Sequence, residues 1–166
     1  MHALLFSSSK VAGYEKRFGY AEEKISEFLS GVHEVIFVPY ALQNHNAYTD
    51  LVKETFLSRG VSLRSVHEFK NPLEAMENAE CIFIGGGNTF LLLDWLYKTG
   101  LIEVIKQKVH AGTKYMGVSA GSNVACCTIK TTNDMPIVYP PSFDALGLVP
   151  FNINAHYFDS DPTSKH

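Results

Sequence analysis

Residues 114–125 read Lys-Tyr-Met-Gly-Val-Ser-Ala-Gly-Ser-Asn-Val-Ala, and they say more about the fold than any other stretch of the chain. A short apolar run ends at Val118, and Ser119 follows between Gly117 and Gly121. The G-x-S-x-G pattern in this setting predicts a strand, a sharp turn and a helix. Small neighbours are needed because the strand and the helix approach each other closely at such a turn.

Ser119 is a candidate nucleophile. The predicted turn would lift its hydroxyl clear of the sheet at the start of a helix, where backbone N–H groups converge and favour negative charge. A serine in that position is typical of covalent catalysis in acyl transfer. The pentapeptide alone leaves open an ordinary strand-to-helix turn with an incidental serine.

A second glycine cluster, residues 85–89, follows the apolar run 81–84 and precedes an apolar helix predicted over 90–97. Sites in open α/β sheets form outside the carboxyl ends of strands, so the two glycine turns can face one crevice. Backbone N–H groups of this loop would then be half of an oxyanion hole. A dinucleotide fingerprint would need glycine at Phe90, and a P-loop would need Gly-Lys-Ser/Thr, so neither is present. A tight turn without chemistry is the remaining alternative.

The composition indicates a single α/β domain over residues 1–166. A net charge of −3 gives no reason to expect nucleic acid or an anionic membrane as a partner. No apolar run approaches the ~20 residues of a membrane span, and the amino terminus lacks a basic leader. Cys81, Cys126 and Cys127 form no disulfide framework, so we expect buried thiols in the cytoplasm. No cofactor or metal is expected, since no Cys/His spacing matches a zinc site. The oligomeric state, a homodimer included, stays open.

Apolar runs alternate with amphipathic ones along the chain, which predicts right-handed βαβ units and a parallel sheet. The apolar runs place strands at 3–6, 34–39, 61–66, 81–84 and 115–118. Helical spacing places helices at 14–29, 47–59, 72–78, 90–97 and 101–109. Residues 128–150 contain four prolines and no helical period, so we expect a loop-rich region over one end of the sheet.

An activated serine needs a base, and His156 is the candidate among seven histidines. It follows a strand-like run, 152–155, and it comes after the nucleophile as in α/β-hydrolases. The other histidines are interpreted as surface residues. A hydrogen-bonded histidine at a strand end is the structural alternative. A metal site with Asp159 and Asp161 is disfavoured, because alternating acids in a polar tail are usually solvated. Asp134, in the polar loop 131–136, could reach over the site as the orienting acid, although nothing in the sequence shows that it touches His156.

With these residues assembled, the chain resembles the peptidase E, or α-aspartyl dipeptidase, family of serine peptidases. The resemblance runs along the whole chain and rests on four motifs, at 83–90, 117–121, 131–137 and 154–157. It implies a flavodoxin-like parallel sheet with helices on both faces, related to class I glutamine amidotransferases. It also implies hydrolysis of dipeptides with an N-terminal aspartate. In that reaction Ser119 would be the nucleophile, His156 the base, and the N–H groups of Gly87 and Ala120 the oxyanion donors. Asn88 is a further candidate for substrate binding.

Members of that family continue well beyond the point that corresponds to residue 166, where they supply an acidic triad member and an arginine for the substrate aspartate. We therefore expect the domain to be incomplete at its C-terminus and the natural protein to be longer. We also expect that residues 1–166 alone would not hydrolyse Asp-X dipeptides efficiently. Among the arginines present, Arg17 is assigned to the first helix, and Arg59 and Arg64 to the flanks of a weak strand. None is expected beside a glycine turn. Two alternatives stay open: a related hydrolase, cyanophycinase-like or an esterase, and a non-catalytic ligand-binding module.

Overall fold

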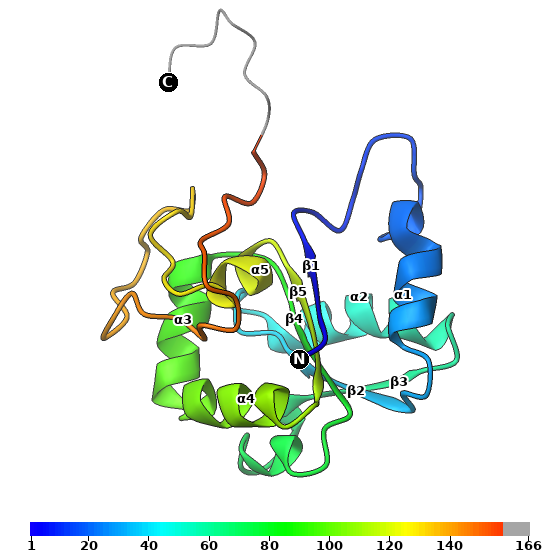
Figure 1. Ribbon diagram of the computed structural model, residues 1–166, viewed down its shortest axis with the longest axis horizontal. Helices are drawn as coiled ribbons and strands as arrows, with labels where there is room; N and C mark the ends of the chain where they lie inside the picture. The colour runs from blue at the N-terminus through cyan, green and yellow to red at the C-terminus, as the bar shows by residue number, and fades with distance from the viewer. Residues whose placement is uncertain (158–166) are drawn as a thin grey trace, which may run out of the picture.

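A computed structural model of the chain describes residues 1–157 and shows a five-stranded sheet in the order β1-β5-β4-β2-β3 (Figure 1). Every neighbouring pair is parallel. If β1 is set aside, the other strands lie in the order second, first, third, fourth, which is the flavodoxin-like arrangement. The predicted fold class is confirmed. The strands are β1 (Ala3–Phe6), β2 (Glu34–Val38), β3 (Ser62–Ser65), β4 (Cys81–Ile84) and β5 (Lys114–Val118).

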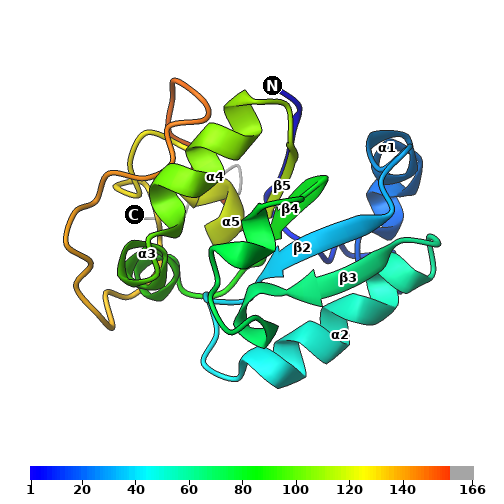
Figure 2. The same cartoon turned by 90° about the horizontal axis from the view of Figure 1, so that it is seen from below.

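Helices cover both faces of the sheet (Figure 2). One face carries α1 (Glu22–Phe28) and α2 (His45–Leu57), and the other carries α3 (Thr89–Lys98), α4 (Leu101–His110) and α5 (Ala120–Val124). Residues 1–157 also contain three 3-10 turns: η1 (Gly19–Ala21), η2 (Val66–Glu68) and η3 (Glu74–Met76). All four residues of the central strand β4 are buried, as expected for a parallel strand covered on both faces. The result is a separate hydrophobic core on each side of the sheet.

The first helix is shorter than predicted, because α1 begins only at Glu22. Phe18 has a left-handed backbone, with φ of 60°, and its buried ring packs against Phe6 at a centroid distance of 5.1 Å. Phe18 therefore enters the core from a turn. The four-residue step from Tyr14 to Phe18, which resembles one face of a helix, does not reflect a helix here, and Tyr14 is exposed. Residues 7–18 instead form a loop at the carboxyl end of β1.

Four other local predictions are wrong. Residues 72–78 contain only the 3-10 turn η3, and residues 152–155 form no strand. Leu51, which has the spacing of an inward-facing residue in the helix predicted over 47–59, is exposed, and so is Cys127, where a buried thiol was expected. Residues 128–150 are loop-rich as predicted, with one isolated antiparallel bridge. Within residues 1–157, no helix combines the length and apolar character that crossing a membrane requires.

Candidate active site

Ser119 occupies the turn between β5 and α5 in a backbone conformation that few residues adopt, with φ of 52° and ψ of −111°. The neighbouring glycines make this turn possible. A Cβ on Gly117 would lie 2.6 Å from the carbonyl oxygen of Gly121, and a Cβ on Gly121 would clash with the carbonyl of Ile84. The strand and the helix thus approach as closely as the G-x-S-x-G pattern predicts, and the half-buried Ser119 stands at the sheet's carboxyl edge.

His156 meets this serine. Its Nε2 lies 2.7 Å from Ser119 Oγ, although the two residues are 37 positions apart. The backbone N–H of His156 donates to Ser7 Oγ at 2.7 Å, which fixes the histidine to the end of β1. The sequence reasoning did not find Ser7, although its position directly after a strand was a signal. The structure therefore brings together the two residues that were assigned as nucleophile and base.

The loop after β4 passes directly beside the serine. A Cβ on Gly86 would lie 3.1 Å from Ser119 Cβ. Gly87 has φ of 137°, and a side chain there would clash with the Ala41 carbonyl. Among residues 1–157, the N–H of Gly87, in the loop after β4, donates to no backbone carbonyl. The N–H of Ala120, the first residue of α5, donates to none outside that helix. Two free backbone donors are thus available near Ser119.

The carboxylate of Asp134, in the segment 131–136, is hydrogen-bonded to the end of the glycine loop 85–89. Its Oδ2 accepts hydrogen bonds from Thr89 N–H at 2.7 Å, Thr89 Oγ1 at 2.5 Å and Thr132 Oγ1 at 3.0 Å. Asp134 does not orient His156 among the described residues, since the ring of His156 is hydrogen-bonded to Ser119 and its backbone N–H donates to Ser7. Asp134 therefore satisfies the first N–H of α3 and ties the segment 131–136 to the loop after β4.

Asn88 strengthens the same junction. Its Oδ1 accepts from Leu91 N–H at 3.0 Å, its Nδ2 donates to the Met135 carbonyl at 2.8 Å, and its N–H donates to the Ala41 carbonyl at 2.9 Å. The side chain is the N-cap of α3. These bonds hold the backbone of Gly87 in place.

A cavity of about 290 Å³ opens in front of Ser119. The loops after β1, β2, β4 and β5 contribute to it, and its lining includes Ser119, His156, Gly86, Gly87, Tyr48 and Arg17. The expectation that no arginine lies beside a glycine turn is thus wrong for Arg17. The physical reason is the turn at 13–18, which replaces the first part of the predicted helix and folds Arg17 over the end of β1.

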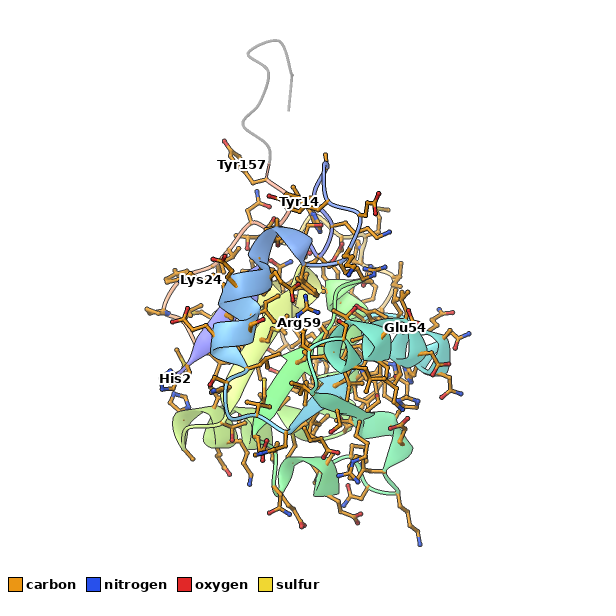
Figure 3. All side chains as sticks on the ribbon, turned by 90° about the vertical axis from the view of Figure 1, so that its right-hand side faces the viewer. His2, Tyr14, Lys24, Glu54, Arg59 and Tyr157 are labelled. Atoms are coloured by element: carbon orange, nitrogen blue, oxygen red, sulfur yellow. The ribbon has the colours of Figure 1, made fainter. Side chains whose placement is uncertain are left out.

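A larger hollow, of about 460 Å³, is lined by the loop after β1, α1 and α2, and it includes Arg17 but neither Ser119 nor His156. Figure 3 shows Arg59 between these helices, and its guanidinium donates to Glu22 and to the Thr55 carbonyl. The same view places Tyr14 and Tyr157 at one end of the molecule, the end to which the loop after β1 extends. That end carries the candidate site.

Tyr48 forms part of the cavity wall, with its hydroxyl against Gly85. Burial raises the pKa of Tyr48, while a hydrogen bond from Gly86 and the charge of Arg17 act in the opposite direction. The phenol is therefore neutral near pH 7 and available as a hydrogen-bond donor. Asp159 and Asp161, which were considered as metal ligands, lie outside the described residues. Residues 1–157 hold no group of three His, Cys, Asp or Glu side chains placed for a metal ion.

Comparison with known proteins gives consistent results. A sequence model described as Peptidase family S51 matches residues 3–166. Peptidase E of Streptomyces coelicolor is 47% identical over 169 residues, covering 100% of this chain and 68% of that protein. A Drosophila melanogaster protein named "Probable alpha-aspartyl dipeptidase" is 45% identical, covering 98% of this chain and 69% of that protein. A crystal structure described as that of a "Putative Peptidase E Protein" from Listeria monocytogenes EGD-e superposes with a TM-score of 0.73 at 26% identity, covering 90% of this chain and 76% of that one.

Proposed function

Since the chain belongs to peptidase family S51 and is a serine-type dipeptidase, we propose that Ser119 is its nucleophile and His156 its general base. We further propose that it hydrolyses dipeptides with an N-terminal aspartate. The observation that carries the proposal is the 2.7 Å contact between Ser119 Oγ and His156 Nε2 at the strained turn. The name of the Streptomyces relative supports a peptidase, and the name of the Drosophila relative supports the dipeptide substrate and the aspartyl specificity.

The proposed reaction begins when Ser119 Oγ attacks the scissile carbonyl while His156 Nε2 takes the hydroxyl proton. The N–H groups of Gly87 and Ala120 then stabilise the negative oxygen of the tetrahedral intermediate. His156 passes its proton to the leaving amine, and the peptide C–N bond breaks. A water molecule next attacks the acyl-serine with His156 as base, which releases aspartate and restores the serine.

The site supports this mechanism through preorganisation. Ser119 cannot relax out of its turn without moving the two glycines, and Ser7 holds the His156 backbone. Asp134 and Asn88 fix the loop that presents the Gly87 N–H. Loss of one oxyanion donor typically costs about 10²–10³ in rate, so the support of this loop matters for turnover.

A double-mutant cycle tests the proposal. Ser119→Ala should lower kcat for Asp-Leu by on the order of 10⁶, and His156→Ala should be nearly as damaging, because the two residues act as one unit. The double variant should then be no worse than the poorer single one. Circular dichroism and thermal melting of each variant provide the control for folding. If the loss in the double variant equals the product of the single losses, the two residues work independently and the proposal is wrong.

A further inference from the structure

The loop after β1 is ordered by its own contacts. Phe18 N–H donates to the Ser9 carbonyl at 2.7 Å, and Tyr20 Oη donates to the Ser8 carbonyl at 2.6 Å. The buried Phe18 ring also packs edge-on against Phe83 of β4, with a centroid distance of 6.2 Å. These contacts fix the backbone of Arg17, which precedes Phe18, at the carboxyl edge of the sheet.

The guanidinium of Arg17 retains an uncompensated charge. Its Nη1 donates to Ser9 Oγ at 2.8 Å, and the side chain is half-buried. The other two arginines have carboxylate partners, Glu22 for Arg59 and Glu34 for Arg64. Among the ion pairs within residues 1–157, Arg17 takes part in none. Most of its five N–H donors are therefore free for a ligand.

Arg17 also shares a wall of the cavity with Ser119. Tyr48 lines it too, with its hydroxyl against Gly85, and the next residue, Gly86, adjoins the serine. Arg17 and Tyr48 therefore border one cavity, where burial raises the pKa of Tyr48 and the positive charge of Arg17, a smaller effect, lowers it. None of the described residues that line this cavity is an aspartate or a glutamate. An anion in this cavity would thus meet a cation and a neutral hydroxyl donor. The glutamates near Arg17, which are Glu15, Glu22 and Glu54, line the larger hollow that Arg17 also borders, and none of them forms an ion pair with it.

We propose that Arg17 is a specificity-determining residue that binds a carboxylate of the substrate, with the Tyr48 hydroxyl as a second donor. The inference rests on the proposed function, since it places the carboxylate beside Ser119. A guanidinium matches a carboxylate with two parallel N–H···O bonds, and a half-buried site strengthens them. An Asp-X dipeptide carries two such groups, the aspartyl side chain and the C-terminal carboxylate, and the experiment separates them.

The test measures dipeptide binding by calorimetry in the Ser119→Ala protein, so that no turnover is needed. Three ligands are compared: Asp-Leu, Asn-Leu, which lacks the side-chain carboxylate, and Asp-leucinamide, which lacks the C-terminal one. Arg17→Gln should weaken Asp-Leu binding by roughly 10- to 100-fold, as expected for lost hydrogen bonds between charged groups. The effect should disappear for the ligand that lacks the carboxylate Arg17 binds. Arg17→Lys should recover part of the affinity, because it keeps the charge but loses the planar fork.

Arg64→Gln is the matched control, because it removes an arginine charge at β3, on the opposite edge of the sheet from β1. It should leave all three affinities unchanged. The proposal is overturned if Arg17→Gln leaves Asp-Leu binding unchanged, or if all three ligands lose affinity equally, since a structural role would not discriminate among them. If the double-mutant cycle shows that Ser119 and His156 act independently while Arg17→Gln still weakens binding as described, only the catalytic proposal is rejected and the role of Arg17 stands.

Discussion

At Ser119, the catalytic proposal and the backbone geometry make separate predictions. A non-glycine residue at this φ and ψ costs about 1–3 kcal/mol. Glycine would relieve that strain but would add about 0.5–1 kcal/mol of chain entropy to the unfolded state. We therefore expect Ser119→Gly to be at least as stable as Ser119→Ala in urea unfolding, with both inactive. A glycine variant clearly less stable than the alanine variant would show that the turn is not strained.

Asp134 is expected to act through geometry, since its carboxylate accepts three hydrogen bonds from Thr89 and Thr132. Removing a helix cap of this kind costs about 0.5–2 kcal/mol, so Asp134→Ala should lower the free energy of unfolding by that amount. Its kcat should fall by less than the roughly 10²–10⁴-fold typical of a general acid or base. A kcat as low as that of His156→Ala in a folded Asp134 variant would instead identify Asp134 as part of the catalytic unit.

Among the elements, β2 and β4 are joined at their amino ends by Glu80. Its carboxylate accepts the N–H of His33 at 2.6 Å and of Glu34 at 3.3 Å. The hydrogen bonds with His33, above all the one from its backbone, lower the pKa of Glu80 from its ordinary value. A pKa lowered by folding stabilises the protein above the unfolded value, and this contribution disappears as the pH falls through the folded value.

Glu80→Gln should therefore reduce stability at pH 7, and the difference from the natural protein should shrink toward zero as the pH falls below the lowered pKa. Urea midpoints measured from pH 7 to pH 3 give this difference directly. Glu74→Gln is the matched control, because Glu74 is the exposed first residue of the turn η3, and it should show no such trend. A Glu80→Gln difference that stays constant with pH would mean that the carboxylate charge contributes nothing.

Over the whole molecule, the sheet order explains why residues distant in sequence form one site. The carboxyl ends of β1, β2, β4 and β5 border the same cavity, so Ser7, Gly87 and Ser119 approach one another. The sequence predicted this edge because buried parallel strands have continuous apolar runs and because the glycine turns follow them directly. Both signals are local, and the strands β4 and β5 were placed almost residue for residue.

Contacts across long separations could not be predicted from local patterns. Asp134 bonds Thr89, 45 positions away, and His156 bonds Ser7, 149 positions away. Arg17 was misplaced because Tyr14 and Phe18 have helical spacing, although Phe18 enters the core from a left-handed turn. Tertiary packing overrides the periodic signal there, and it carries the arginine into the site.

The most direct test of the central claim is the reaction of the protein with a fluorophosphonate, followed by peptide mass spectrometry. A serine activated by a neighbouring histidine should form one covalent adduct, on the peptide that contains Ser119. Ser119→Ala should abolish the adduct, and His156→Gln should slow its formation strongly because the base is lost. An unlabelled protein, an adduct on another residue, or labelling of Ser119 at an unchanged rate in His156→Gln would contradict the assignment of Ser119 and His156 as nucleophile and base.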